Sequence, residues 1–506
     1  MVLGTASDAG KSLTVAALCR ILRQDGFDVA PFKAQNMALN SFATREGHEI
    51  GRAQAVQAQA ARVEPHVDMN PILLKPTSDV GSQVIINGKV VGNYKGVDYY
   101  ALKPQLLEAV TSAYQRVATR HEIILLEGAG SPVEMNLKDR DVVNLKMAEI
   151  ANAKCLLVTD IDRGGVFASL VGTFALLEPH ERERFCGFLI NKFRGDVSLF
   201  LPGIDYLEER LSQSCLGVIP YLHNHGIDDE DSVSVERRAV RPPQAESAED
   251  QPVICVIGLP YLSNFTDFTA LVNLSDVVVY YTRQPEDARF ADVVILPGSK
   301  NTISDLLWLK QHGWESTIDK HIAAGKPLLG ICGGFQMLGR EIRDPHRTES
   351  DVEVVPGLNV LNVTTVLARE KITRQATARF CESSCFANGN GDPLFAGYEI
   401  HLGDTVLGEG VQPVFQLQRL GESESLRDGA TSSDGKIFGT YLHGLFDSAE
   451  GLNWLLNHWR RLRGKKASTI MIDPLAERER RYDTLADHYR SNLKLDLIYR
   501  ALDEQR

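Results

Sequence analysis

The sequence predicts an α/β protein with two doubly wound, mostly parallel sheets and a helical appendage at its C-terminal end. Strand and helix signals alternate through both halves, which is typical of parallel sheets wrapped by helices. Residues 229–251 are charged, contain proline and have no periodic apolar face, so they are typical of a linker. We therefore expect one domain at 1–228, a second at 252–447, and an appendage at 448–506 that packs on the second domain.

The composition fits a globular protein. A chain of 506 residues with 43% hydrophobic side chains can build well-packed cores. The net charge of −12 disfavours nonspecific nucleic-acid binding. No apolar run has membrane-spanning length and no signal peptide is evident, so we expect a cytoplasmic protein without a membrane partner. The scattered cysteines predict reduced thiols, and the sequence gives no oligomeric state.

The first twelve residues contain a phosphate-binding loop. Gly4-Thr-Ala-Ser-Asp-Ala-Gly-Lys-Ser12 precedes an amphipathic helix, so backbone N–H groups and the helix N-terminus can hold phosphates. Lys11 adds positive charge on the outer phosphates, and the Ser12 hydroxyl can ligate Mg²⁺. The alternative is a glycine-containing turn with a chance Gly-Lys-Ser. We predict that ATP binds here, in contact with Thr5, Asp8, Gly10, Lys11, Ser12 and Lys33.

Acidic side chains follow two later apolar strands. Glu127 ends the first of these strands, where nucleotide-binding folds keep a carboxylate for Mg²⁺, and it is our second candidate ligand beside Ser12. Asp160, Asp162 and Arg163 follow the second strand and suit a metal or a carboxylate substrate. For these three residues, a solvated salt bridge in a loop is an equally good reading.

The most unusual sequence segments are 32–41, 51–61 and 68–76, which are too polar for ordinary core elements. Helical spacing puts Gln54 and Gln57 close to one face. Such a surface can bind a large ligand that carries many carboxylate and amide groups, whereas the alternative is a plain solvated helix. The candidates for contacts with such a ligand, or with an acyl phosphate made from it, are Gln35, Asn36, Asp68, Asn70, Asp160, Asp162 and Arg163.

The second half contains a nucleophile elbow. Residues 327–339 form an apolar strand, then Cys332 between glycines, then an apolar helix. A cysteine at such a turn is exposed and sits near a helix N-terminus, which favours the reactive thiolate. His443 ends another short apolar strand, where a general base for the thiol can sit. An inert buried thiol and a structural histidine are the alternatives.

These segments resemble the class I glutamine amidotransferase domain over about residues 252–447. Its Gly-x-Cys-x-Gly-x-Gln signature is met by Gly330, Cys332, Gly334 and Gln336. The resemblance implies that Cys332 attacks the glutamine amide and that His443 moves the proton. It also implies that Gly298 and Gly333 form the oxyanion hole and that Gln336 binds glutamine.

One departure from that signature concerns the third member of the site. The glutamate expected two residues after the histidine is replaced by Leu445, and Glu399 is at best a weak substitute. The corrinoid-processing branch of the family lacks this glutamate too.

In the first half, the spacing of the phosphate loop resembles the dethiobiotin-synthetase-like branch of P-loop NTPase proteins. The match implies that Asn191 reads the adenine of ATP.

Taken in order, the motifs of both halves resemble the cobyric acid synthase family. The resemblance implies that ATP, Mg²⁺ and glutamine are used to amidate four peripheral carboxylates (b, d, e and g) of the corrinoid adenosylcobyrinic acid a,c-diamide. One rival is a related amidotransferase acting on another carboxylate, such as an a,c-diamide synthase or a cell-wall amidase. The other is a P-loop partitioning ATPase, for which a Cys332–His443 pair has no use.

Overall fold

A computed structural model describes residues 1–77, 81–228, 251–387 and 392–505. It divides the chain into two compact units. Unit 1 comprises Met1–Ala38, Ile50–Ile227 and Arg478–Arg506, and unit 2 comprises Leu39–Glu49 and Asp228–Glu477. The predicted linker at 229–251 lies, apart from its last residue, outside the described part of the chain.

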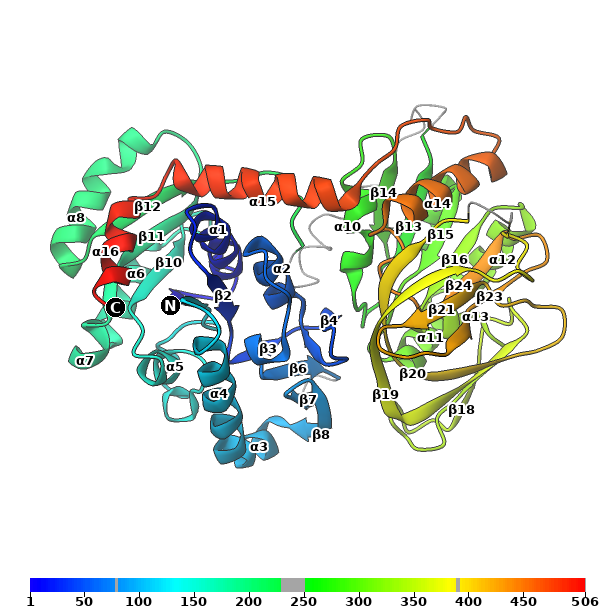
Figure 1. The fold of residues 1–506 in the computed structure, drawn as a ribbon, viewed down its shortest axis with the longest axis horizontal. Helices are drawn as coiled ribbons and strands as arrows, with labels where there is room; N and C mark the ends of the chain where they lie inside the picture. The colour runs from blue at the N-terminus through cyan, green and yellow to red at the C-terminus, as the bar shows by residue number, and fades with distance from the viewer. Residues whose placement is uncertain (78–80, 229–250, 388–391, 506) are drawn as a thin grey trace. The chain divides into compact units, whose positions relative to one another are not determined.

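Unit 1 is built on a parallel sheet in which β1, β10, β11 and β12 are neighbours. A parallel pair of β2 and β9 continues it through a bridge between Val2 and Glu127. Figure 1 shows β10, β11 and β12 side by side and α1 beside β2. The strands are β1 (Val2–Gly4), β2 (Val29–Phe32), β9 (Ile123–Leu126), β10 (Cys155–Asp160), β11 (Phe185–Phe193) and β12 (Cys215–Pro220).

Helices cover this sheet and a smaller mixed sheet adjoins it in unit 1. The order β3-β6-β7-β8 has one parallel and two antiparallel pairings. Its strands are β3 (Gln35–Met37), β6 (Ile72–Pro76), β7 (Gly81–Ile86) and β8 (Lys89–Lys95). The helices up to residue 211 are α1 (Lys11–Gln24), α2 (Arg52–Ala60), α3 (Gly96–Tyr99), α4 (Lys103–Ala118), α5 (Leu145–Ile150), α6 (Val166–Leu176), α7 (Pro179–Arg182) and α8 (Leu201–Leu211). Single 3₁₀ turns are η1 (Val67–Met69), η2 (Tyr100–Leu102), η3 (Lys138–Arg140) and η4 (Val197–Phe200).

Unit 2 also has a parallel sheet, in the order β14-β13-β15-β16-β24, with β23 antiparallel at its edge. β13 reads Val-Ile-Cys-Val-Ile and is buried throughout, as expected for a strand covered on both faces. The strands are β13 (Val253–Ile257), β14 (Val278–Thr282), β15 (Val293–Leu296), β16 (Leu328–Ile331), β23 (Ala430–Thr431) and β24 (Ile437–Thr440). The helices are α10 (Thr269–Val272), α11 (Thr302–Gln311), α12 (Trp314–Ala323), α13 (Gly333–Leu338) and α14 (Ala449–Leu462), with the 3₁₀ turns η5 (Phe265–Phe268) and η6 (Pro285–Phe290).

A second, largely antiparallel sheet completes unit 2. Its order is β18-β17-β19-β21-β22, and β20 pairs with β19. The strands are β17 (Glu341–Arg343), β18 (Val354–Pro356), β19 (Val363–Phe380), β20 (Phe395–Leu407), β21 (Phe415–Arg419) and β22 (Ser425–Asp428). A short pair, β4 (Ser41–Ala43) and β5 (Glu49–Gly51), is the remaining sheet among the described residues. The predicted α/β class with two parallel sheets is confirmed.

The C-terminal helices differ from the predicted appendage. α14 lies in unit 2, but Arg478–Arg506, with most of α15 (Pro474–Arg490) and all of α16 (Leu495–Asp503), lies in unit 1. The fully buried Arg20 of α1 explains this, because it donates hydrogen bonds to Glu479 at 2.8 Å and Asp483 at 2.7 Å on α15. A buried guanidinium must be paired, so the acidic face of α15 packs on α1. The expectation that residues 448–506 pack on the second domain is therefore wrong for Arg478–Arg506, although α14 does lie in unit 2.

Within the described residues, no helix is both long and apolar enough to cross a membrane.

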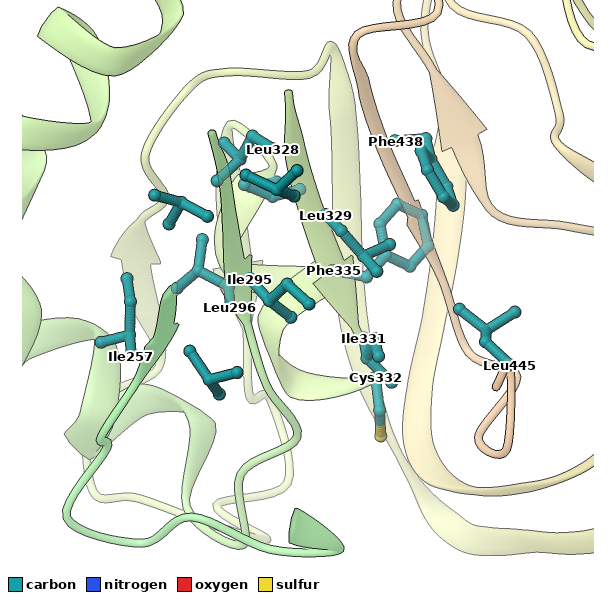
Figure 2. Packing of buried hydrophobic residues seen from close by; sticks show 14 of the residues in the cluster. Ile257, Ile295, Leu296, Leu328, Leu329, Ile331, Cys332, Phe335, Phe438 and Leu445 are labelled. Atoms are coloured by element: carbon teal, nitrogen blue, oxygen red, sulfur yellow. The ribbon is translucent and has the colours of Figure 1, made fainter. Parts of the chain in front are cut away.

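The core of unit 2 surrounds β16, where Leu328, Leu329 and Ile331 pack among Ile295 and Phe335. Figure 2 shows Cys332 at the end of this strand, with its sulfur pointing away from the packed side chains. The core therefore fixes the strand that presents this thiol.

Candidate active site and nucleotide site

Cys332 stands in a strained turn between β16 and α13. Its φ of 52° and ψ of −109° are unfavourable for a residue with a Cβ, and such strain persists only where the surroundings enforce it. Gly334 permits the turn, since a Cβ there would lie 2.0 Å from the carbonyl oxygen of Leu296. The thiol is 7% exposed and donates to the carbonyl oxygen of Ile400 at 3.5 Å. This is the geometry of a nucleophile elbow.

His443 follows β24, the strand next to β16. Its Nδ1 bonds Oδ2 of Asp267 at 2.7 Å, and Asp267 also accepts from the Gly444 N–H at 3.1 Å. Burial alone would lower the pKa of His443, but the negative charges of Asp267 and of a Cys332 thiolate, together with the hydrogen bond to Asp267, raise that pKa to about 10. Cys332, His443 and Asp267 thus form one buried charge-coupled group.

Asp267, in η5, was missed by the sequence analysis, and Glu399 does not take its place. Glu399 accepts from His401 at 3.1 Å and from Arg419 at 2.6 Å, on the second sheet. Leu445 is fully buried in the core. The available signal for Asp267 was an acidic residue inside the apolar run Phe265-Thr-Asp-Phe268, where an uncompensated carboxylate is costly.

The two predicted oxyanion donors lie in the same neighbourhood. A Cβ on Gly298 would lie 3.2 Å from Cε1 of His443. A Cβ on Gly333 would lie 2.9 Å from the backbone nitrogen of Ser299, the residue after Gly298. Both positions therefore need glycine for close approach, and both adjoin the Cys332–His443 group.

Gln336 lies on α13, one turn after Cys332, and is 3% exposed. Its Oε1 has no hydrogen-bond partner among the described residues. Leaving such a buried acceptor unpaired costs about 1–3 kcal/mol, which a bound ligand with a donor group would recover. This atom is the best local sign that a polar ligand binds beside Cys332.

The phosphate-binding loop of unit 1 runs from Gly4, at the end of β1, to Lys11, the first residue of α1. Lys11 Nζ donates to the carbonyl oxygens of Ala6 at 2.9 Å and Gly130 at 3.2 Å, so it crosses the mouth of the loop. Thr5 shares a hydrogen bond with Thr159 at 3.1 Å. The loop thus has a closed geometry that is suited to wrapping a phosphate.

Asn191 and Asp8 also contact this loop region. Asn191 Nδ2 donates to the carbonyl oxygen of Ala9 at 3.0 Å and leaves no room for a Cβ on Gly10. Asp8 pairs with Arg163 at 2.8 Å. The predicted adenine-reading amide is therefore used here to hold the loop.

Glu127 lies at the centre of the predicted metal site and is 1% exposed. Its Oε1 accepts from Ser12 Oγ at 2.8 Å and from Lys33 Nζ at 2.9 Å, and its Oε2 accepts from Gln57. A hydroxyl and a carboxylate oxygen fit Mg²⁺, which binds few protein groups and completes its shell with phosphates and water. No group of three His, Cys, Asp or Glu able to hold a metal occurs in the described part of the chain. Gln57 belongs to this group and was not among the predicted contacts.

The polar segments fold into a buried amide cluster. Asn36 donates to Gln54 at 3.0 Å, and Asn70 accepts from the Gly51 N–H at 2.9 Å. Gln54 is fully buried and its Nε2 has no partner among the described residues. The solvated-helix alternative is therefore wrong for α2, and Gln54 joins Asn36 as a candidate for ligand contact.

The other predicted ligand contacts are divided between this cluster and separate ion pairs. Gln35 accepts a hydrogen bond from Tyr99. Asp68 pairs with Arg116 and Arg120 at 2.6 and 2.7 Å. Burial alone would raise the pKa of Asp68, but hydrogen bonds from His66 and Arg116 hold that pKa below its usual range. This carboxylate is already fully partnered, which favours a structural role.

Three predicted residues gather at the carboxyl end of β10. Asp160 accepts from Lys192 at 2.9 Å and lies 3.5 Å from Arg163, while Asp162 pairs with Arg194 at 2.8 Å. Asp160 is buried, whereas Asp162 and Arg163 are exposed. The structure thus links Asp160 and Arg163 to the phosphate loop through Asp8 and Lys192.

Two protein-family descriptions match the chain. Residues 1–232 match the "CobQ/CobB/MinD/ParA nucleotide binding domain", and residues 253–451 match the "CobB/CobQ-like glutamine amidotransferase domain". The cobyric acid synthase of Syntrophobacter fumaroxidans is 46% identical over 99% of this chain and 98% of its own length. That of Pelotomaculum thermopropionicum is 47% identical over 99% and 96%. That of Caldanaerobacter subterraneus is 45% identical over 100% and 99%.

Proposed function

Because this chain belongs to the cobyric acid synthase family, we propose that it transfers the amide nitrogen of glutamine to carboxylates of a corrinoid at the expense of ATP. The acceptor is adenosylcobyrinic acid a,c-diamide, and its b, d, e and g carboxylates are amidated in turn. The single observation that carries the proposal is the buried Cys332–His443–Asp267 group at the strand ends of unit 2.

Glutamine hydrolysis follows from the roles of these side chains. His443 takes the thiol proton, and the Cys332 sulfur attacks the side-chain amide carbon of glutamine. The Gly298 and Gly333 N–H groups stabilise the oxyanion that forms. His443 then protonates the leaving nitrogen, the C–N bond breaks, and ammonia departs. Water cleaves the remaining thioester to give glutamate and to restore the thiol. Gln336 holds the substrate glutamine through its unpaired Oε1.

Unit 1 supplies the activation that amide formation needs, because a carboxylate is a poor electrophile. ATP provides the phosphoryl group that turns the carboxylate into an acyl phosphate, with Mg²⁺ neutralising phosphate charge. Lys11, Thr5 and the backbone N–H groups of Asp8 and Gly10 would hold the phosphates, and Ser12 and Glu127 would hold the metal. Lys33 would fix Glu127 from the other side. Asn191 would contact the adenine once nucleotide displaces it from the loop.

The corrinoid contacts belong to the same proposal. The amide cluster around Gly51 supports Asn36, Gln35 and Asn70 as contacts, since the ligand presents many amide and carboxylate groups. Asp160, Asp162 and Arg163 adjoin the phosphate loop and suit the acyl phosphate. Asp68 is retained as a candidate, although its arginine partners would have to release it.

Replacement of the nucleophile tests the glutaminase half. The Cys332→Ala protein should release no glutamate from glutamine but should still amidate the corrinoid when ammonium chloride supplies the nitrogen. Cys215→Ala, which removes a buried thiol of unit 1, is the matched control and should keep both activities. Undiminished glutamine use by Cys332→Ala would remove this cysteine from the mechanism.

A further inference from the structure

Segment 39–49 lies in the N-terminal half of the sequence but belongs to the unit built mainly from the C-terminal half. Its neighbours on both sides belong to unit 1, yet Leu39–Glu49 belongs to unit 2. Lys371 of β19 pairs with Glu49 at 2.6 Å, where Glu49 is 1% exposed. Gln375 of β19 donates to the carbonyl oxygen of Ala43 at 3.2 Å. An ion pair at Glu49 and a hydrogen bond from the Gln375 side chain to the backbone at Ala43 thus hold this segment on the sheet that carries β19 and β20.

The segment also contacts the loop that supports His443. Asn40 Oδ1 accepts from the Phe265 N–H at 3.2 Å, and the Ser41 N–H donates to Oδ1 of Asn264 at 3.0 Å. On its other side, Asn264 Nδ2 lies 3.5 Å from Nε2 of His443. Asn264 is 3% exposed and has a φ of 52°, a conformation that asparagine tolerates better than most residues. Its amide is therefore held between the segment and the imidazole.

The Ser41 contact decides which way the Asn264 amide faces. A backbone N–H can only donate, so the amide oxygen must point to Ser41. The NH₂ group is then left to face Nε2 of His443. A donor at Nε2 favours an imidazole whose lone pair is on Nε2 and whose proton is on Nδ1, facing Asp267.

We propose that segment 39–49 is a built-in positioning element of the glutaminase site, which acts by orienting Asn264 so that the neutral form of His443 carries its lone pair on Nε2 and its proton on Nδ1. Asp267 specifies the tautomer from one side of the ring and Asn264 specifies it from the other. A second contact agrees with this role. The Phe42 ring lies 5.8 Å from the Tyr398 ring, and Tyr398 stacks on His443 at 5.2 Å with an interplanar angle of 13°. The inference rests on the proposed glutaminase activity, and Asn264 acts through His443 and not on the substrate.

Substitutions at Asn264 test the proposal in the full-length protein. Asn264→Ala removes the donor, and we expect kcat for glutamate release to fall about three- to tenfold while KM for glutamine changes little. Asn264→Asp keeps an acceptor for Ser41 but turns a carboxylate toward Nε2, which stabilises the imidazolium. The titratable groups against the ring are then the introduced carboxylate and the native Asp267, Cys332 and Tyr398. The acid limb of the kcat/KM profile should move to higher pH.

The segment side is tested through Asn40. Asn40→Leu removes the acceptor for the Phe265 N–H and should reproduce the fall in kcat, whereas Asn40→Asp keeps an acceptor and should recover part of it. Asn359→Ala is the matched control, because Asn359 is an exposed asparagine of unit 2 with a φ of 54°. It reports what loss of a left-handed asparagine does away from the site.

The readouts separate positioning from general damage. Amidation with ammonium chloride should stay at the wild-type rate in the Asn264 and Asn40 variants. An unchanged kcat and pH profile for both Asn264 variants overturns the inference, and so does an equal fall of glutamine- and ammonia-dependent rates with a lower Tm. If the wild-type protein releases no glutamate, or if Cys332→Ala releases it at the wild-type rate, the proposed glutaminase itself has failed, which is a different result.

Discussion

Replacing Asp267 by asparagine perturbs the candidate site without changing its shape. The Gly444 N–H donates to Oδ1 of Asp267 at 3.1 Å, so the amide oxygen of the variant stays on that side. Its NH₂ group then faces Nδ1 of His443, where the carboxylate accepts a bond at 2.7 Å. Nδ1 must become the acceptor and the ring proton moves to Nε2. His443 is thereby held in the tautomer that cannot take the thiol proton.

The size of the effect follows from two contributions. A hydrogen bond between a charged carboxylate and an imidazolium contributes about 1.5–3 kcal/mol, which corresponds to about ten- to a hundredfold in rate. The wrong tautomer adds to this, since the same change in serine triads lowers kcat by about 10⁴. We expect Asp267→Asn to lower kcat for glutamate release by about 10²- to 10⁴-fold. Without the charge of Asp267, burial is less strongly opposed, so the pKa of His443 should fall.

The comparison with alanine makes the assay specific. Asp267→Ala removes the charge but does not impose a tautomer, so Asp267→Asn should be at least as slow although it is closer in shape. Asp276→Asn, which makes the same chemical change at a half-exposed residue paired with Arg460 at 2.7 Å, should leave glutamate release unchanged. An Asp267→Asn protein within threefold of wild type, with ammonia-dependent amidation intact, would refute the reasoning.

Two further predictions concern the nucleotide site and acid stability. Lys11→Met should lower the rate of ATP-dependent amidation at least about a hundredfold and leave the basal glutaminase rate unchanged. Lys146→Met, on the exposed face of α5, is the control and should change neither rate. Equal amidation rates in the two variants would contradict a phosphate role for Lys11. His321 is 6% exposed and donates to the Pro327 carbonyl oxygen at 2.9 Å, and burial lowers its pKa from 6.5 to about 4. As the pH falls, His321 is therefore protonated in the unfolded chain before it is protonated in the folded protein. The free energy of unfolding should fall by about 2 kcal/mol between pH 7 and pH 5. His321→Gln should lack that part of the fall in urea titrations at both pH values, and an identical pH dependence in the variant would exclude His321 as its source.

The sequence was most informative where function depends on consecutive residues. The elbow at Cys332 and the loop from Gly4 to Ser12 are local, because a strand, a turn of fixed glycines and a helix follow one another within about a dozen residues. The parallel sheets were predictable for a similar reason, since their strands are short continuous apolar runs.

What could not be predicted depends on contacts between distant parts of the chain. Asp267 and His443 are separated by 176 positions, and no spacing rule connects them. Segment 39–49 overlaps the predicted polar segment 32–41 and continues towards the next one at 51–61, yet it belongs to unit 2, where Glu49 pairs with Lys371. The C-terminal helices were expected to pack on the second domain, whereas the buried Arg20 pairs with Glu479 and Asp483 of α15 in unit 1.

In the proposed reaction, glutamine nitrogen reaches the corrinoid through Cys332 chemistry. The most direct measurement is mass spectrometry of adenosylcobyrinic acid a,c-diamide after incubation with the purified protein, Mg-ATP and glutamine labelled with ¹⁵N in its amide. We expect stepwise gain of labelled amides up to four, with one glutamate released for each. Unchanged corrinoid alongside continued release of glutamate would contradict it and would require another carboxylate acceptor.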